Sequence, residues 1–403
     1  MALPKLRFKE FGCDWENSCI KNSDILVIDG DRGENYPKLD EFTPHGFCLF
    51  LNAGNVTKEG FNFENTQFIS YEKDCLLRKG KLVRNDVVMT TRGTLGNVAF
   101  YDKKVNFKNV RINSGMVILR SRNKVLPLYL NYFLNTPKFD NWLLKNAFGS
   151  AQPQLTIKLI SSLEITYPQL EEQTKIANFL TAVDEKISQL NEQHQLMIQY
   201  KKGVMQKIFS QEIRFKDDNG KEFGEWEERI LEDVSIIIMG SSPKSENYNE
   251  LGIGLPLLQG NADIKNRKSC PRNFTTEITK ECDVGDILMS VRAPVGYVAK
   301  AMHDACIGRG IAAIRVKENN NQEFLYQYLI YMEDIWGKFS QGSTFDSVNS
   351  EQIKKLSLFI PCLQEQTKIA DFLTKLDDKI EKLALQLEQV KMWKKGLLQL
   401  MFV

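Results

Sequence analysis

The chain has 403 residues, with 53 Lys and Arg against 51 Asp and Glu and a formal net charge of +2. Its 42% hydrophobic and 26% charged residues are typical of globular proteins, which excludes collagen-like and disordered classes. No apolar run approaches the ~18 residues of a membrane span, and no signal-peptide core follows Met1. We therefore expect a cytoplasmic protein without a membrane anchor.

The first 167 residues have the pattern of a mixed α and β domain. Short stretches rich in branched apolar residues predict strands, and one segment with helical spacing follows them. The predicted strands are Ile25–Ile28, Val87–Met89, Asn97–Phe100 and Met116–Leu119, and the predicted helix is Leu128–Leu134. Loops rich in Gly, Asn, Ser, Lys and Arg separate these elements, and such loops are the usual place for recognition residues.

A long helix is predicted over residues 168–210. Its apolar residues alternate at spacings of four and three over about five heptads, which is typical of a coiled coil. The seam consists of Ile176, Leu180, Val183, Ile187, Leu190, Met197, Val204 and Ile208, with His194 and Lys201 as polar exceptions. At ~1.5 Å per residue, this helix would be roughly 50–60 Å long.

The same segment recurs at the end of the chain. Residues 168–210 match residues 361–403 at 21 of 43 positions, with an offset of 193 and no gap. The second seam consists of Ile369, Leu373, Leu376, Ile380, Leu383, Leu387, Val390, Leu397 and Met401, with Lys394 as its exception. Such internal similarity indicates a tandem repeat.

Weaker matches extend the repeat to the segments before each helix. Asp86–Ala99 aligns with Asp286–Ala299, and Gly115–Arg120 aligns with Gly310–Arg315. The second unit has predicted strands at Ile287–Met289, Tyr297–Ala299 and Ile311–Ile314 and a predicted helix at Phe324–Tyr331. We therefore divide the chain into a first mixed domain (1–167), a first repeated helix (168–210), a second mixed domain (211–360) and a second repeated helix (361–403).

Each repeated helix has one narrow apolar stripe that must be covered. The simplest way to cover it is to pack it against the other copy in the same chain. The residues expected to take part in helix pairing are Ile176, Leu180, Val183 and Ile187 in the first copy, and Ile369, Leu373, Leu376 and Ile380 in the second. The seam alone fits parallel or antiparallel pairing, although an antiparallel pair would create a pseudo-two-fold axis. Lys201 and Lys394 occupy the same seam position, where they either fix the register or extend out of the seam toward solvent.

The sequence offers no catalytic or metal site. It lacks a phosphate-binding G-x-x-x-x-G-K-[ST] loop, G-x-G-x-x-G, H-E-x-x-H and G-x-S-x-G. Its eight cysteines form no C-x-x-C pair and are expected to be scattered buried thiols, and only three histidines occur. The triplets Asp184–Lys186 and Asp377–Lys379 look like part of a nuclease site, but their spacing places them on a solvated helix face.

The near-neutral charge is a cancellation between the two mixed domains. Residues 1–167 carry a net charge of +6 and residues 211–360 a net charge of −5. Basic residues gather at Arg78–Arg92, Lys103–Lys124, Lys265–Arg272 and Arg292–Arg315. A basic face on each domain is what phosphate binding requires. The alternative is that each cluster is only a solvated loop.

Two variable domains that alternate with two similar helices resemble the specificity (S) subunit of Type I restriction–modification enzymes. The resemblance spans the chain and rests mainly on P-x-L-x-E-Q-T-K-I-A-x-F-L-T-x-x-D-x-K-I, which begins at Pro168 and Pro361. Each unit also starts with R-F followed by F-G-x-x-W or F-G-x-W, and Leu255–Ile264 and Gly285–Gly296 are similar to a target-recognition domain of that family. The implied fold is α+β, with two mixed α/β target-recognition domains joined by two long antiparallel coiled-coil helices as a pseudo-two-fold tandem repeat.

The resemblance also implies a function without catalysis. Each domain would read one half of a bipartite, asymmetric site in double-stranded DNA, while the helices set the spacer and dock two methyltransferase (M) subunits. Two restriction (R) subunits complete the assembly, and S-adenosylmethionine, ATP and Mg belong to these partner subunits. A coiled-coil scaffold with two protein-binding domains is one alternative, and a self-sufficient DNA enzyme is another.

By their place in this family, the DNA-binding candidates lie on the basic loops. Arg92 and Arg292 lie on matching loops after a strand and form the best pair. The others are Lys103, Lys104, Lys108, Arg111 and Asn113 in the first domain, and Lys265, Arg267, Lys268 and Arg309 in the second. The loops Gly149–Gln154 and Gly342–Ser347 are further candidates. Structural roles are expected for the turn residues Gly96 and Gly296, the sheet-end residues Arg120 and Arg315, and the core residues Phe11, Trp15, Phe223 and Trp226.

Overall fold

The structure, a computed structural model, describes residues 3–147, 154–292, 295–334 and 348–403. It contains two compact units: unit 1 comprises residues 1–190 with 386–403, and unit 2 comprises residues 191–385. Both boundaries fall inside the long helices, so each unit combines a mixed domain with part of both helices. Within the described residues, no helix combines the length and apolar character needed to cross a membrane.

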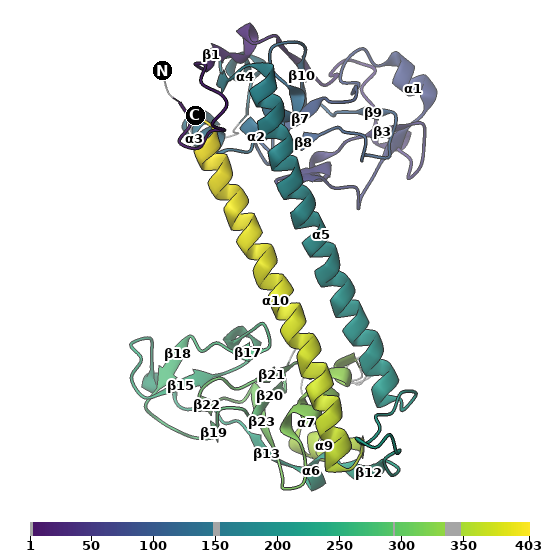
Figure 1. Ribbon diagram of the computed structural model, residues 1–403, viewed down its shortest axis with the longest axis vertical. Helices are drawn as coiled ribbons and strands as arrows, with labels where there is room; N and C mark the ends of the chain where they lie inside the picture. Colours follow the sequence, from purple (N-terminus) through teal and green to yellow (C-terminus); the bar gives the residue numbers. More distant parts are fainter. Residues whose placement is uncertain (1–2, 148–153, 293–294, 335–347) are drawn as a thin grey trace. The chain divides into compact units, whose positions relative to one another are not determined.

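The mixed domain of unit 1 is built on two sheets (Figure 1). The larger has the strand order β2-β10-β7-β8 and the smaller β6-β3-β9, with two separate pairs, β1–β11 and β4–β5. The strands are β1 (Glu16–Cys19), β2 (Ile25–Asp29), β3 (Cys48–Phe50), β4 (Val56–Thr57), β5 (Gly60–Phe61), β6 (Phe68–Ile69), β7 (Val87–Thr90), β8 (Val98–Phe100), β9 (Val110–Arg111), β10 (Met116–Ser121) and β11 (Glu164–Tyr167).

The mixed domain of unit 2 repeats this plan. Its sheets have the orders β13-β23-β20-β21-β17-β16 and β14-β18-β15-β22-β19, and β12 pairs with β24. The strands are β12 (Glu227–Ile230), β13 (Ser235–Met239), β14 (Tyr248–Asn249), β15 (Leu255–Leu258), β16 (Ile264–Lys265), β17 (Lys268–Ser269), β18 (Asn273–Thr275), β19 (Glu281–Cys282), β20 (Ile287–Ser290), β21 (Val298–Lys300), β22 (Ala305–Ile307), β23 (Ile311–Val316) and β24 (Ser357–Ile360).

Helices complete both units. The α-helices are α1 (Tyr71–Leu76), α2 (Pro127–Phe133), α3 (Pro137–Ala147), α4 (Ile157–Ser161), α5 (Leu170–Phe209), α6 (Leu231–Val234), α7 (Gln322–Tyr331), α9 (Ser350–Lys354) and α10 (Leu363–Met401). The 3-10 helices are η1 (Ile20–Asn22), η2 (Leu39–Glu41), η3 (Ala53–Asn55), η4 (Ser245–Asn247) and η5 (Asn261–Asp263). The predicted strands and helices are all confirmed, although the smaller sheets were not predicted.

Alternation along the central strands joins the two layers of each domain. On β7, Val87 and Met89 pack with α2 and its neighbours, whereas Val88 enters the core beneath the smaller sheet. On β20, Ile287 and Leu288 divide in the same way between two cores. Since successive strand residues point to opposite faces, both faces of these strands are buried and must be apolar.

The long helices pair in the antiparallel direction. In unit 1, Ile176, Leu180 and Val183 near the start of α5 are buried with Leu397 and Met401 near the end of α10. In unit 2 the start of α10 meets the end of α5, where Ile369 and Leu373 share a cluster with Met205, Ile208 and Phe209. The expected antiparallel coiled coil is therefore confirmed, with the helices 40 and 39 residues long.

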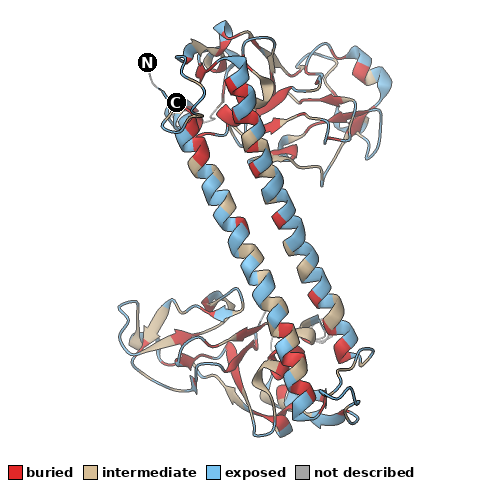
Figure 2. Ribbon diagram, viewed as in Figure 1, coloured by how far each residue is buried: buried red, intermediate tan, exposed pale blue. Residues whose placement is uncertain are grey.

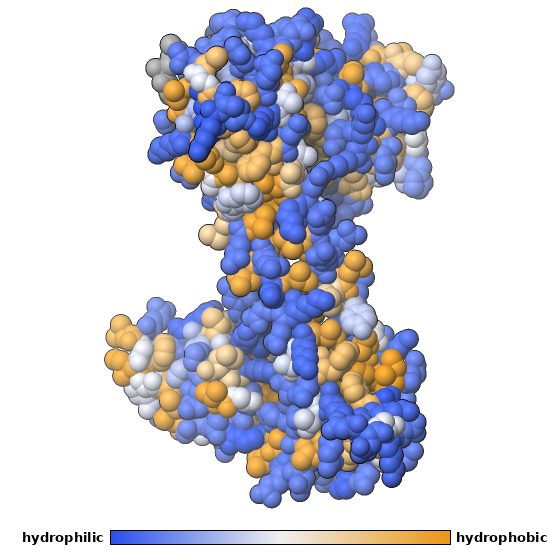
Figure 3. Space-filling model, viewed as in Figure 1, coloured by the Kyte–Doolittle hydropathy of each residue, from blue (hydrophilic) through white to orange (hydrophobic). Residues whose placement is uncertain are grey.

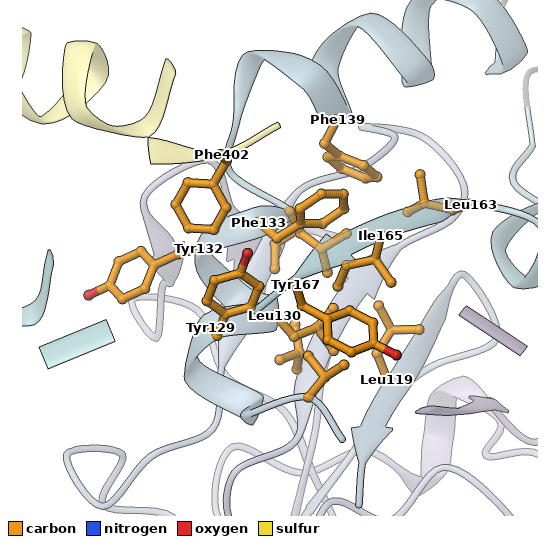
Figure 4. Close-up of a cluster of buried hydrophobic side chains, with 14 of the residues drawn as sticks. Leu119, Tyr129, Leu130, Tyr132, Phe133, Phe139, Leu163, Ile165, Tyr167 and Phe402 are labelled. Atoms are coloured by element: carbon orange, nitrogen blue, oxygen red, sulfur yellow. The ribbon is translucent and has the colours of Figure 1, made fainter. Parts of the chain in front are cut away.

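The seam residues also belong to the domain cores. Figure 4 shows Phe402, just after α10, beside Tyr129 and Phe133 of α2, and the Phe402 and Tyr129 rings lie 5.1 Å apart. Farther along the helices, Ile187 and Leu376 are only partly buried and Ile380 is of intermediate exposure, whereas Leu190 and Leu387 are buried, so burial varies along each helix (Figure 2).

The two seam lysines form ion pairs across the helices. Lys201 Nζ lies 2.6 Å from Asp377 Oδ1, and Lys394 Nζ lies 2.6 Å from Asp184 Oδ1. Both pairs keep the offset of 193, so they fix the same register twice. Burial lowers the pKa of Lys201, and the nearby Asp377 carboxylate opposes this effect. The spacing of their triplets predicted that Asp184 and Asp377 lie on a solvated helix face. Instead, each carboxylate pairs with a lysine of the other helix.

Matching arginines attach each domain to the start of its long helix. Arg7 pairs with Glu172 and Arg214 with Glu365, each through Nε and Nη2 at 2.7–2.8 Å. The bond to the carboxylate raises the pKa of both arginines. Other expectations for the core hold in part. Trp15 and Trp226 are buried, but Phe11 and Phe223 are half-buried and lie outside the core clusters, and of the eight free cysteines only Cys48, Cys282 and Cys306 are buried.

We predict that Asp377→Asn lowers the free energy of unfolding by about 1–3 kcal/mol, because the buried Lys201 ammonium loses its charged partner. Asp378→Asn is the matched control, since Asp378 is exposed and pairs with no described residue. Urea unfolding of the full chain measures both variants. Equal stability of the two variants would contradict a role for the ion pair.

Candidate nucleic-acid interface

In unit 1, three loops meet at one edge of the larger sheet. Strands β2 and β7 end at this edge and β10 begins there, because β10 lies antiparallel between them. Thr91 N–H donates to the Gly115 carbonyl at 2.7 Å. A Cβ on Gly30 would lie 2.2 Å from the Asn113 carbonyl oxygen, so only glycine permits this approach. We call residues 30–33, 91–96 and 113–115 the first edge.

Unit 2 builds the same edge from equivalent loops. Val291 N–H donates to the Gly310 carbonyl at 3.0 Å, and a Cβ on Gly240 would lie 2.2 Å from the Gly308 carbonyl oxygen. We call residues 240–243, 291–292 and 308–310 the second edge. Gly96 N–H and Gly296 N–H also close matching turns onto Thr90 and Ser290 carbonyls at 2.9 and 2.8 Å. Each edge thus has the same frame of backbone hydrogen bonds.

The edges carry the predicted pair of arginines. Arg92 and Arg292 are exposed at equivalent positions, and Arg92 lies next to Gln154, with Nη2 3.4 Å from Oε1. Arg309 is exposed on the second edge, and neither its side chain nor that of Arg292 bonds to another described residue. Asn113 is half-buried, and its Oδ1 accepts from Gly115 N at 2.8 Å, which shapes the first edge.

Arg111 does not lie on this surface. It is 5% exposed, and its guanidinium bonds to Asp74 and to the carbonyls of Lys79 and Leu77. Burial alone would raise the pKa of Asp74, but the bonds from Lys81 and Arg111 outweigh it and the pKa is lowered. A charge held this way stabilises the domain, which argues against the DNA contact predicted for Arg111.

The hairpin β16–β17 faces other parts of unit 2. Arg267 bonds to Glu333 through Nη1 at 2.6 Å and Nη2 at 2.8 Å, and it lies over the Tyr297 ring. Lys268 Nζ lies 2.7 Å from Glu381 on α10. These carboxylates already occupy both cations, which argues against the predicted DNA contacts of Arg267 and Lys268. Lys265 is exposed.

The remaining predicted lysines lie away from the first edge. Lys103, Lys104 and Lys108 are exposed on the loop after β8, at the opposite end of the sheet, because β8 runs antiparallel to β7. Lys104 lies 3.6 Å from Glu185 of α5. Arg120 and Arg315 occupy that opposite end too, each bonded to an aspartate, Asp86 or Asp286, that raises the arginine's pKa.

Sequence reasoning missed part of the first edge. Arg32 follows β2 within Gly30–Gly33, and its turn-forming glycines could have signalled a loop at the end of a predicted strand. The loops Gly149–Gln154 and Gly342–Ser347 lie outside the described residues except for Gln154. Among the side chains that the structure does describe, no three His, Cys, Asp or Glu residues come together as metal ligands could.

Comparison with known proteins gives one family. The family described as "Type I restriction modification DNA specificity domain" matches residues 13–199 and 224–392. The chain is similar to the MjaX specificity subunit of Methanocaldococcus jannaschii, assigned to the type I restriction enzymes, with 34% identity over 81% of this chain and 79% of the relative. It is also similar to the MjaVIII specificity subunit of the same organism, with 25% identity over 79% and 78% of the two chains.

A solved structure shares the fold. The S subunit of a type I restriction–modification system from M. genitalium superimposes with a TM-score of 0.62 and 18% identity, over 100% of this chain and 99% of that one. At this identity the similarity supports the architecture of two repeated units.

We predict that Arg292→Ala weakens binding to DNA by about 1–3 kcal/mol, because the variant loses an exposed arginine that has no partner among the described residues. Arg229→Ala is the control, since Arg229 is an exposed arginine of the same unit on β12 and pairs with Glu227. Binding of DNA by the assembled complex is measured for both variants at one fixed salt concentration. An unchanged affinity for Arg292→Ala would remove this residue from the interface.

Proposed function

Because this chain belongs to the family of Type I restriction–modification DNA specificity domains, we propose that it selects the DNA sequence on which such a complex acts. Each target-recognition domain reads one half of a bipartite, asymmetric site in double-stranded DNA. The observation that carries this proposal is the pair of matching edges, each held by the same backbone bonds and each presenting an exposed arginine.

The chemistry of the edges suits DNA. Exposed guanidinium groups can donate to phosphate oxygens or to purine edges, whereas backbone-fixed loops keep these donors in place. The two edges differ in their side chains, so two different half-sites are expected. The second domain has a net charge of −5, but acids such as Glu333 and Asp286 are paired with cations, and the exposed Arg292 and Arg309 stand on the second edge itself.

The long helices are proposed to set the spacer and to dock two M subunits. Tyr200 of α5 is 53% exposed and Trp393 of α10 is 52% exposed, and they are equivalent residues of the repeat. Apolar side chains interrupt the hydrophilic surface of the helices in Figure 3. Two copies of one docking surface are what two identical partners require, and exposed aromatic residues are frequent anchors at interfaces.

Catalysis is assigned to the partners. The M subunits would hold S-adenosylmethionine and the two R subunits would use ATP and Mg, while this chain contributes recognition and positioning. The relatives carry the name of specificity subunits, which supports this division. The alternative of a protein-binding scaffold gives no reason for exposed arginines at the matching positions Arg92 and Arg292.

We predict that cells producing this chain with its M subunit carry methylated adenines in a split motif with a fixed gap. Base-resolution mapping of the methylome is the measurement, and cells that produce the M subunit alone are the control. A methylome that does not change when this chain is added would contradict the proposed function, as would methylation or cleavage by the purified chain alone.

We predict that Trp393→Ala and Tyr200→Ala each reduce the complex from two M subunits to one, and that the double variant binds neither. Each change removes one of two equivalent anchors. Tyr71→Ala is the control, because Tyr71 is a 58% exposed aromatic residue on α1. Light scattering of the purified complex gives the stoichiometry, and two bound M subunits in the double variant would exclude these anchors.

A further inference from the structure

The two edges exchange an arginine and a serine at facing positions. Strand register makes Arg32 equivalent to Ser242, since Asp29 pairs with Val117 as Met239 pairs with Ala312. The same register makes Ser114 equivalent to Arg309. The first edge therefore has arginine on the loop after β2 and serine on the loop before β10, and the second edge has the reverse.

Direct contacts join the exchanged residues within each unit. Arg32 Nη2 donates to the Ser114 carbonyl at 3.2 Å, and Arg309 N–H donates to Ser242 Oγ at 3.1 Å. The neighbouring Thr91 and Val291, which precede Arg92 and Arg292, bond to the same loops. Each edge consequently presents two arginines. In both units these arginines lie on, or are bonded through themselves or a neighbouring residue to, the short loop before β10 or β23.

Arg32 is held in place but keeps free donors. Its Nη2 also donates to Asp29 Oδ1 at 3.1 Å, and the side chain remains 44% exposed. Among the described residues, none accepts a bond from Nε or Nη1 of Arg32. The loop itself is tied down by Asp31, whose carboxylate accepts from Arg78 N at 2.7 Å and Gly33 N at 3.1 Å. An arginine fixed at one nitrogen loses less conformational freedom when the others bind a ligand.

We propose that Arg32 contacts DNA from the first edge beside Arg92, in the role that Arg309 has beside Arg292 on the second edge. The proposal rests on the proposed function and adds a recognition residue to it. The acceptors are oxygen or nitrogen atoms on the base edges of the half-site bound by the first domain. Because of this exchange, a position-by-position comparison of the two units does not reveal Arg32. The first edge has its arginine on the loop after β2, whereas the second edge has its arginine on the loop before β23.

The test compares Arg32→Ser with Arg122→Ser in the complete complex with M subunits. Serine occupies the equivalent position of the second unit, so Arg32→Ser suits the fold. Arg122 is an exposed arginine that follows β10 at the opposite end of the sheet, and its substitution changes the charge equally. The probes are a duplex that carries the motif defined by methylome mapping and a duplex with its first half-site scrambled.

We expect Arg32→Ser to bind the intact motif about 5- to 100-fold more weakly than the unchanged chain, and Arg122→Ser to differ by less than about twofold. On the scrambled duplex, Arg32→Ser and the unchanged chain should bind alike. Equal binding of Arg32→Ser to the intact motif, or an equal loss with Arg122→Ser, would overturn the role of Arg32. A thermal unfolding midpoint equal to that of the unchanged chain shows that any loss is not a folding defect. If the unchanged complex itself defines no motif, the proposed function fails rather than this assignment.

Discussion

Each long helix has one apolar stripe that must be buried, and the rest of this structure depends on that constraint. A helix of 40 residues with a single stripe is not stable alone in water, so each half of the stripe is buried where a domain and the other helix are both available. Leu180 and Leu373 occupy the same place in the two units, each fully buried in a cluster that includes domain residues. The mixed domains and the long helices therefore share their hydrophobic cores and are not separate modules.

Carboxylates decide which basic residues remain available. Asp74, Glu333 and Glu381 bind Arg111, Arg267 and Lys268, and such hydrogen-bonded pairs make these cations less available to phosphate. Arg292 and Arg309 lack such partners among the described residues and lie on one edge. Net charge per domain is consequently a poor guide to binding, whereas the position of each acid relative to each base is informative.

Much of the architecture could be predicted from the sequence because repetition and the heptad pattern are properties of the chain itself. The smaller sheets were missed since strands of two or three residues, such as β9, carry no readable period. The burial of Arg111 could not be predicted, because it depends on Asp74, 37 positions earlier in the chain. Arg32 was missed for the opposite reason, since it stands outside the basic clusters and becomes relevant only when strand register places it opposite Ser114.

The exchange between Arg32–Ser114 and Ser242–Arg309 shows how the side chains of an edge can differ while the fold persists. The close approaches at Gly30 and Gly240 and the bonds at Thr91 and Val291 involve backbone atoms, so they hold whatever side chains the loops carry. Exposed side chains on these loops, such as those of Arg32 and Arg309, can change without a cost in core packing, because they lie outside the buried clusters. Two units with the same frame of backbone bonds can thus present different donor patterns, which is what the proposed reading of two different half-sites requires.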